Sequence, residues 1–100
     1  MSIQVPLGQI DYKIAVVAME NGSAVNIASA SMKKIKVVKP SREEIFQAAT
    51  FETNGSDGDM YYKTVLNDLD ELGWYTFRGY YEIGNFKGYT LPGKFLVVPV

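Results

Sequence analysis

The chain has 100 residues, of which 47% are hydrophobic and 21% are charged, and its formal net charge is −1. This length supports one domain with one hydrophobic core, and the composition is that of a globular chain rather than a disordered one. The near-neutral charge provides no general attraction to nucleic acid or to an anionic membrane, so we expect neither as a partner. Because the chain has no Cys and no His, disulfides, thiol nucleophiles and the commonest general base are excluded.

The N-terminal segment shows no signal peptide, because no basic region precedes an apolar run. No apolar run approaches the roughly 20 residues that a membrane-spanning helix needs. We therefore expect the protein to be made and kept in the cytosol, or to leave the cell by lysis.

Apolar and polar residues alternate with a period of two along most of the chain, which predicts short strands separated by Gly, Pro, Asn and Asp turns. Residues 1–9 are predicted to be an N-terminal arm or an edge strand, and residues 10–100 a single domain. The fold class predicted is all-β, an antiparallel immunoglobulin-like β-sandwich of about seven strands. The strands are expected at residues 10–19, 25–27, 32–39, 43–53, 60–64, 74–83 and 94–100.

Two of these segments allow more than one structural interpretation. Residues 43–53 alternate as a strand would, and we favour a strand, but Ser41 followed by residues 43–49 would also suit one capped helical turn. Tyr75 follows an acidic corner at residues 67–73, where immunoglobulin-like sandwiches place a tyrosine whose hydroxyl bonds to the backbone of that corner. The alternative is a core tyrosine with another partner, and either role is structural.

The sequence predicts no enzyme. The acidic turn at residues 54–59 lacks the ligand spacing of a calcium loop, and ordinary turn hydrogen bonds between Asn or Asp side chains and the backbone explain it. No Gly-rich phosphate loop, nucleophile elbow or facing pair of carboxylates is recognisable. We therefore expect no catalytic residue, no cofactor and no metal site.

A basic run is the first candidate for a binding surface. It would serve as a contact strip for nucleic acid or an acidic protein surface, or it is a solvated face whose lysines discourage edge-to-edge pairing. The alternation favours the solvated face, because Lys33 should point away from Lys34 and Lys36. The run comprises Lys33, Lys34, Lys36, Lys39 and Arg42.

The second candidate lies on the long strand at residues 74–83, whose odd-numbered residues are predicted to face the core. Trp74, Arg78 and Tyr80 then share the opposite face, where exposed aromatic rings could stack on sugars or anchor a protein partner. In the alternative interpretation, Trp74 closes the end of the sandwich and Tyr80 packs under a loop.

Four stretches, taken together, resemble a family: the small immunoglobulin-like proteins and N-terminal domains of tailed bacteriophages, similar to the N-terminal domain of the baseplate upper protein. They carry, in order, a strand ending in Lys-Pro, a Gly-Asp-Gly-like turn into an aromatic strand, an Asp-Leu-Asp corner before Gly and an aromatic residue, and a closing strand. The stretches are Ala28–Ser41, Asn54–Tyr62, Asn67–Tyr75 and Lys94–Val98. The chain departs from the family at Ser41-Arg42-Glu43, where a glycine usually follows Lys-Pro.

The resemblance implies a structural module of the virion, present in the host cytoplasm during assembly, in many copies, with other virion structural proteins as partners. Because the chain ends at Val100, we expect a free-standing module that docks on another component. Ile3, Val5 and Leu7 alternate and would supply a strand to a partner sheet, unless residues 1–9 form the first strand of the domain itself. The rival hypothesis is a module that binds a host glycan through Trp74, Tyr80 and a loop at Tyr89.

Overall fold

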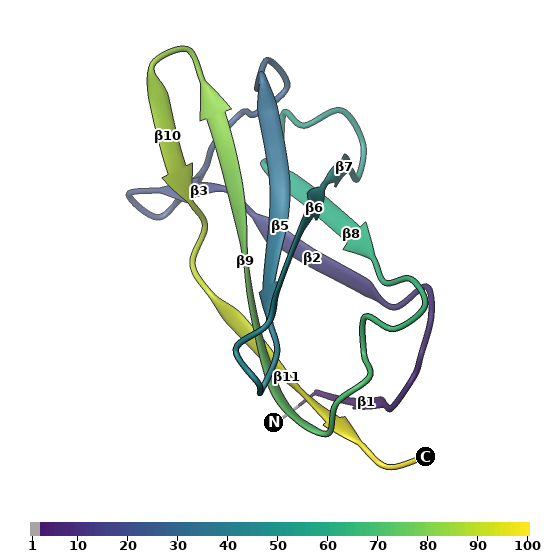
Figure 1. Cartoon of the computed structure of the whole chain (residues 1–100). Helices are drawn as coiled ribbons and strands as arrows, with labels where there is room; N and C mark the ends of the chain where they lie inside the picture. Colours follow the sequence, from purple (N-terminus) through teal and green to yellow (C-terminus); the bar gives the residue numbers. More distant parts are fainter. Residues whose placement is uncertain (1–2) are drawn as a thin grey trace.

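The computed structural model of the chain describes residues 3–100, which form strands and loops without any helix (Figure 1). None of these residues therefore belongs to a helix that could cross a bilayer. The all-β prediction is confirmed. The strands are β1 (Gln4–Pro6), β2 (Lys13–Val17), β3 (Met19–Glu20), β4 (Ser23–Ala24), β5 (Met32–Val38), β6 (Glu44–Ala48), β7 (Thr50–Phe51), β8 (Asp59–Lys63), β9 (Gly73–Ile83), β10 (Phe86–Tyr89) and β11 (Gly93–Val98).

The strands form two main sheets that pack face to face. The larger sheet has the order β1-β11-β9-β5-β6, with β10 also paired to β9, and the smaller sheet has the order β2-β8-β7. Strands β3 and β4 form a separate hairpin around Asn21 and Gly22, which both have positive φ angles as a tight two-residue turn requires.

The prediction of an entirely antiparallel fold is wrong at the first strand, because β1 pairs with β11 in parallel. Val5 lies beside Val97 in this pair and is only 1% exposed. Leu7 packs against the same core, whereas Ile3 is 56% exposed. Residues 4–6 are thus a strand of the domain's own sheet, which is the second of the two alternatives for this segment, and residues 1–2 lie outside the described range.

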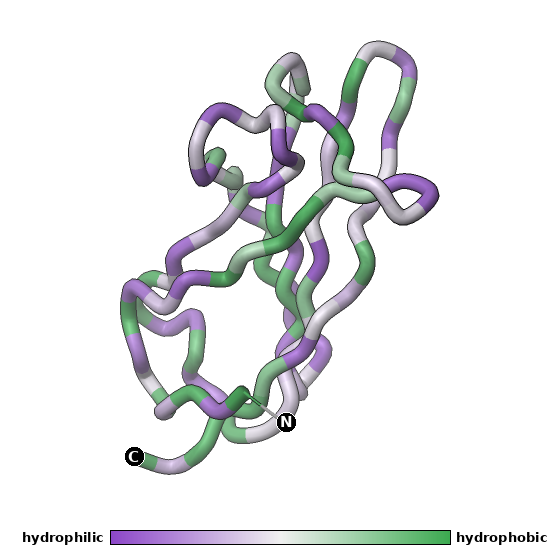
Figure 2. The backbone as a smooth tube through the Cα atoms, turned by 180° about the vertical axis from the view of Figure 1, so that it is seen from behind, coloured by the Kyte–Doolittle hydropathy of each residue, from purple (hydrophilic) through white to green (hydrophobic). Residues whose placement is uncertain are grey.

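The core lies between the two sheets and follows the predicted alternation. The smaller sheet contributes Ile14, Val16 and Met60, and the larger sheet contributes the inward residues of β5, β9 and β11. In Figure 2 the tube accordingly alternates between hydrophobic and hydrophilic colours along these strands. The fully buried side chains of the larger sheet include Ile35, Val37, Tyr75, Phe95 and Val97.

Three strand boundaries differ from the predictions for physical reasons. The first long strand begins at Lys13, not at residue 10, because Asp11 adopts a positive φ angle of 64°. Residues 25–27 form no strand, although Ile27 is fully buried and its N–H donates to the carbonyl of Gly55. The segment predicted as a strand at residues 43–53 forms strands at residues 44–48 and 50–51, divided at the small buried Ala49, so β6 joins the larger sheet and β7 the smaller.

The hairpin between β5 and β6 contains the segment Ser41-Arg42-Glu43. Arg42 has a φ angle of 78°, in the left-handed region that glycine occupies most easily. Its N–H donates to the carbonyl of Lys39, and the N–H of Lys39 donates to the carbonyl of Glu43, both at 2.9 Å. Arg42 thus adopts the backbone conformation for which a glycine is suited, and β6 keeps a regular register with β5.

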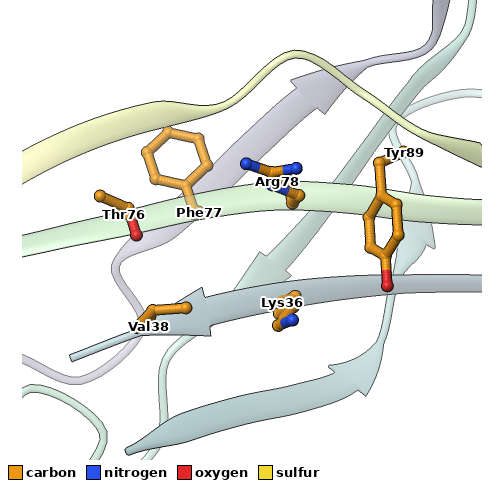
Figure 3. A pocket seen from close by; sticks show the side chains of 6 residues that line it. All are labelled: Lys36, Val38, Thr76, Phe77, Arg78 and Tyr89. Carbon is orange, nitrogen blue, oxygen red and sulfur yellow. The ribbon is translucent and has the colours of Figure 1, made fainter. Parts of the chain in front are cut away.

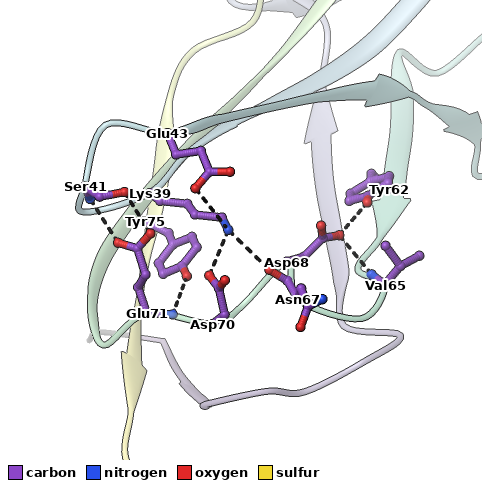
Figure 4. A network of polar contacts seen from close by, with 10 residues as sticks. All are labelled: Lys39, Ser41, Glu43, Tyr62, Val65, Asn67, Asp68, Asp70, Glu71 and Tyr75. Carbon is purple, nitrogen blue, oxygen red and sulfur yellow. Dashed lines mark hydrogen bonds and ion pairs between the residues drawn. The ribbon is translucent and has the colours of Figure 1, made fainter.

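The acidic corner before β9 is held by a network of polar contacts (Figure 4). The hydroxyl oxygen of Tyr75 accepts a hydrogen bond from the backbone N–H of Glu71 at 3.1 Å, which confirms the predicted tyrosine corner. The carboxylate of Glu71 in turn accepts from the N–H of Ser41 at 3.0 Å and from its hydroxyl at 2.7 Å. The corner is therefore tied both to the strand that follows it and to the β5–β6 hairpin.

Lys39 lies at the centre of this network, with only 4% of its side chain exposed. Its ammonium donates to Asp70 Oδ1 at 2.8 Å and to the carbonyl of Asn67 at 3.2 Å. Burial by itself would lower the pKa of Lys39, but the hydrogen bond to Asp70 and the charges of Asp70 and Glu43 outweigh it and raise the pKa. Lys39 is thus a structural cation, not part of a solvated basic face.

At Gly79 in β9 the smaller sheet packs closely against the larger one. A Cβ atom at this position would collide with Met60 Cε and would lie 2.7 Å from Val16 Cγ2, both on the facing sheet. We expect Gly79→Ala to lower the free energy of unfolding by about 1–3 kcal/mol, the usual cost of overpacking a core. Urea unfolding followed by circular dichroism measures this change, and an unchanged midpoint would contradict the close approach.

Removing the carboxylate that pairs with Lys39 should destabilise the fold. We expect Asp70→Ala to cost about 2 kcal/mol, less than a fully buried ion pair because the Asp70 side chain is half exposed. Glu43→Ala is the matched control. The Glu43 carboxylate lies 3.8 Å from the same ammonium but is mostly exposed, and its removal should cost less than about 0.5 kcal/mol. Equal costs in chemical denaturation would show that Asp70 is not the main partner.

Candidate binding surface

The outward face of the larger sheet gathers aromatic and basic side chains from several strands. The register places Lys36 opposite Arg78, Lys94 opposite Thr76, and Tyr89 opposite Tyr80. Side chains that are paired in this way lie on the same face of a sheet. The cations on this face are Lys34, Lys36, Arg78, Lys87 and Lys94, and the carboxylates are Glu44 and Glu82.

Two open depressions adjoin on this face. One, of about 310 Å³, is lined by residues of β5, β9 and β10 that include Arg78 and Tyr89 (Figure 3). The other, of about 470 Å³, lies toward the β5–β6 hairpin and is lined by Trp74, Pro40 and Arg42 among others. Val38 and Thr76 line both, so the two depressions share a border on β5 and β9. We call this surface the outer strip: Lys36, Val38, Trp74, Thr76, Arg78 and Tyr89.

Trp74 lies open to solvent at one end of the outer strip. Its side chain is 43% exposed, and the ammonium of Lys94 lies 4.9 Å from the centre of its ring. Trp74 is opposite Leu96 in the register, on the outward face of the sheet. The sequence allowed Trp74 to be exposed or to close the end of the sandwich. In the structure it is exposed, with a cation over one face of the indole.

Tyr80 belongs to an aromatic cluster at the other end of the strip. Its ring centre lies 5.0 Å from that of Tyr89 and 6.0 Å from that of Phe46. Its hydroxyl donates to Glu82 Oε2 at 2.5 Å, and this hydrogen bond, with partial burial and the negative charge of Glu82, raises the pKa of Tyr80 to about 12. The ring of Tyr80 thus packs against the rings of Phe46 and Tyr89, which leaves little of its surface free for a ligand.

Arg78 connects the cluster to the depression. Its guanidinium carbon lies 5.6 Å from the centre of the Tyr89 ring, within the range of a cation–π contact. Lys36, opposite Arg78, lies 3.5 Å from a carboxylate oxygen of Glu44. The positive charge of Arg78 stands beside an exposed aromatic ring, which is a combination suited to an anionic partner with some apolar surface.

The predicted basic run does not form one surface. Lys34 and Lys36 lie on the outward face, Lys39 is buried, and Lys33 points the other way, with its ammonium 4.6 Å from the centre of the Phe51 ring. The prediction that Lys33 opposes Lys34 and Lys36 is confirmed. Lys39, by contrast, was assigned to a solvated face and is instead enclosed by the acidic corner, a contact between residues 31 apart in sequence.

The acidic turn at residues 54–59 shows the expected turn chemistry. Asn54 Oδ1 accepts from the N–H of Ser56 at 3.0 Å, and Asp57 Oδ1 accepts from the N–H of Asp59 at 3.1 Å. Across residues 3–100 no three carboxylate side chains gather in the geometry of a metal site. The side-chain oxygens of this turn thus serve the backbone of the loop itself.

The pKa of Tyr80 provides a direct test of the cluster. Tyrosine ¹³Cζ signals followed by NMR should give Tyr80 a midpoint near pH 12. In Glu82→Gln, which removes the carboxylate acceptor and its charge, we expect the midpoint to fall toward the ordinary value of 10.0. Glu44→Gln, on the same face but not bonded to Tyr80, is the control and should leave it unchanged. A Tyr80 midpoint near 10 in the unmodified chain would argue against the hydrogen bond.

The sequence was also compared with known proteins. No protein-family model matches it, and no curated protein sequence is significantly similar to it.

Proposed function

We propose that this chain is a non-enzymatic, immunoglobulin-like binding module that contacts an acidic segment of another protein through the outer strip. The setting we propose is the virion of a tailed bacteriophage, where the module is a structural or adaptor component among other virion proteins. The observation that carries the binding role is the outer strip itself, two adjoining open depressions lined by exposed aromatic and basic side chains. The virion setting rests on the resemblance of the four sequence stretches described above.

Two features support an immunoglobulin-like arrangement. The order β11-β9-β5-β6 in the larger sheet and β2-β8-β7 in the smaller one corresponds to the strands G-F-C-C′ and B-E-D of immunoglobulin variable domains. Tyr75 near the start of β9, bonded to the backbone four residues upstream, corresponds to the tyrosine of strand F.

An acidic protein segment fits the strip in charge and in shape. Cations outnumber carboxylates on this face, although the whole chain carries a net charge of −1. From Trp74 to Tyr89, which lies opposite Tyr80, the strip extends roughly 20 Å at the usual rise of a strand, which is the length of about six extended residues. Exposed aromatic and Arg side chains in the centre of a surface are those that most often dominate protein–protein binding.

A host glycan fits the same surface less well. Sugars stack on free aromatic faces, but the indole of Trp74 already has Lys94 over one face and Tyr80 is flanked by two other rings. The depression between them is lined by cations, which have no counterpart in a neutral sugar. The test below therefore includes a neutral oligosaccharide, whose binding would support the glycan hypothesis.

Trp74 is the only tryptophan of the chain, so its fluorescence reports directly on occupancy of the strip. A synthetic peptide of about ten residues, alternating Glu or Asp with Leu or Tyr, should produce a saturable change in this fluorescence. Arg78→Ala should weaken binding about fivefold to tenfold, as expected for a side chain that contributes about 1 kcal/mol or more. Lys63→Ala, a surface cation on the smaller sheet, should leave the affinity unchanged.

Other ligands decide between the alternatives. A saturable response to a neutral oligosaccharide, with none to the acidic peptide, would support the glycan hypothesis and overturn the protein-binding one. A response to single-stranded oligonucleotide that is equal to or stronger than the response to the peptide would also overturn it. An equal affinity of Arg78→Ala and the unmodified chain for the peptide would place the contact elsewhere.

A further inference from the structure

We propose that β6 is a dimerisation edge, at which two copies of this chain join their larger sheets into one continuous sheet by antiparallel β6–β6 pairing about Phe46. This inference is separate from the proposed binding function, because it concerns a different part of the molecule and a different partner. It begins from the position of β6, which ends the larger sheet and has no strand on its second side among residues 3–100.

The hydrogen bonds of β6 show which backbone groups are free. The carbonyl of Glu43 accepts from Lys39, and the N–H of Ala49 donates to Lys33, so these odd-numbered residues face β5. In an antiparallel ladder the bonded residues alternate, and the register continues the same pattern through residues 45 and 47. The N–H and C=O groups of Glu44, Phe46 and Ala48 therefore point away from β5, toward the open edge.

Other open edges of the fold carry the features with which proteins prevent strand addition. The strand β1 ends in Pro6, β10 contains Lys87, and β2 begins with Lys13, while β7 has only two residues. Lysine, proline and very short length are the usual protections of an exposed edge. The five residues of β6 include neither lysine nor proline. Its edge is thus the least protected of the longer strands.

A second copy fits this edge because the edge is complementary to itself. Pairing about Phe46 places Phe46 opposite Phe46 of the second copy, and Glu44 opposite Ala48 of the second copy. All three residues with outward backbone groups would form ladder bonds, up to about six in total. Phe46 is 41% exposed and lies on the outward face beside Tyr80, so pairing would bury its ring against an identical ring.

The charges along this edge are complementary in the same register. Lys34 lies opposite Ala48 within one chain, so Ala48 would separate Lys34 from Glu44 of the second copy. Two strand spacings, roughly 10 Å between Cα atoms, separate this cation from this carboxylate, and only the methyl group of Ala48 lies between them. The ammonium of Lys34 lies 4.7 Å from the centre of the Phe46 ring, and Phe46 is the residue at the proposed dimer axis. The pairing therefore brings together opposite charges twice, once on each side of the axis.

The test uses proline at a position where only an outward N–H is lost. Ala48→Pro removes a bond donor from the proposed interface and leaves the bonds between β5 and β6 intact. Ala15→Pro is the matched control on β2, where Tyr12 and Ala18 bond to the neighbouring strand and the N–H of Ala15 points outward. Sedimentation equilibrium from about 10 µM to about 1 mM should show a monomer–dimer equilibrium for the unmodified chain, since an edge contact of this size is weak. Its dissociation constant should rise at least tenfold in Ala48→Pro and stay unchanged in Ala15→Pro.

A charge exchange provides a second, independent measurement that requires no change in the backbone. Lys34→Glu and Glu44→Lys should each weaken the dimer about fivefold, and the double variant should recover most of the loss. The proposal is overturned if the unmodified chain stays monomeric at about 1 mM. It is also overturned if a dimer forms that Ala15→Pro abolishes or that neither Ala48→Pro nor the charge variants weaken. These results do not depend on peptide binding, so failure of the dimer leaves the role of the outer strip to its own test.

Discussion

The buried ammonium of Lys39 joins the end of β5 to the corner that precedes the longest strand, β9. It lies just after β5 and bonds to Asp70 and to the carbonyl of Asn67, in the corner that precedes β9. The same corner accommodates the hydroxyl of Tyr75, which sets the start of the longest strand. The strands β5 and β9 pair directly from Met32 opposite Glu82 to Val38 opposite Thr76, and Lys39 fixes the corner at the end of this pairing. Because the outer strip lies across these two strands, Lys39 stabilises one end of the surface that we propose binds a partner.

Much of the fold could be predicted from periodicity, because burial alternates with a period of two wherever one face of a strand packs on a core. This is why the inward residues of β9 were identified correctly, and why Tyr75 could be assigned to its corner. Periodicity contains no information on strand direction, so the parallel pairing of β1 was missed. It also does not distinguish a buried loop from a strand, as Ile27 shows, or one extended run from two strands in different sheets, as at Ala49.

The candidate site was only partly visible in the sequence for a related reason. Trp74, Arg78 and Tyr80 lie on one strand, and their common face follows from their spacing. Lys36 and Tyr89 join Arg78 only through the registers of β5 and β10 with β9, which involve contacts between distant residues. The net charge of −1 did not reveal the site either, because the cations gather on the outward face of the larger sheet while most carboxylates lie elsewhere. In the proposed dimer, both outer strips would lie on the same side of one sheet, so that two acidic segments could bind side by side.

The parallel pairing of β1 with β11 has a mechanical consequence. The strands run in the same direction, held by bonds from Leu96 N–H to the carbonyl of Ile3 and from Leu7 N–H to the carbonyl of Val98, each 2.9 Å long. Tension that pulls the start of β1 and the end of β11 apart acts along the strands, perpendicular to these bonds. The ladder is then loaded in shear, and its bonds must break together, whereas a terminal hairpin under the same tension would open one bond at a time. The domain should therefore resist stretching along this direction far better than its small size suggests.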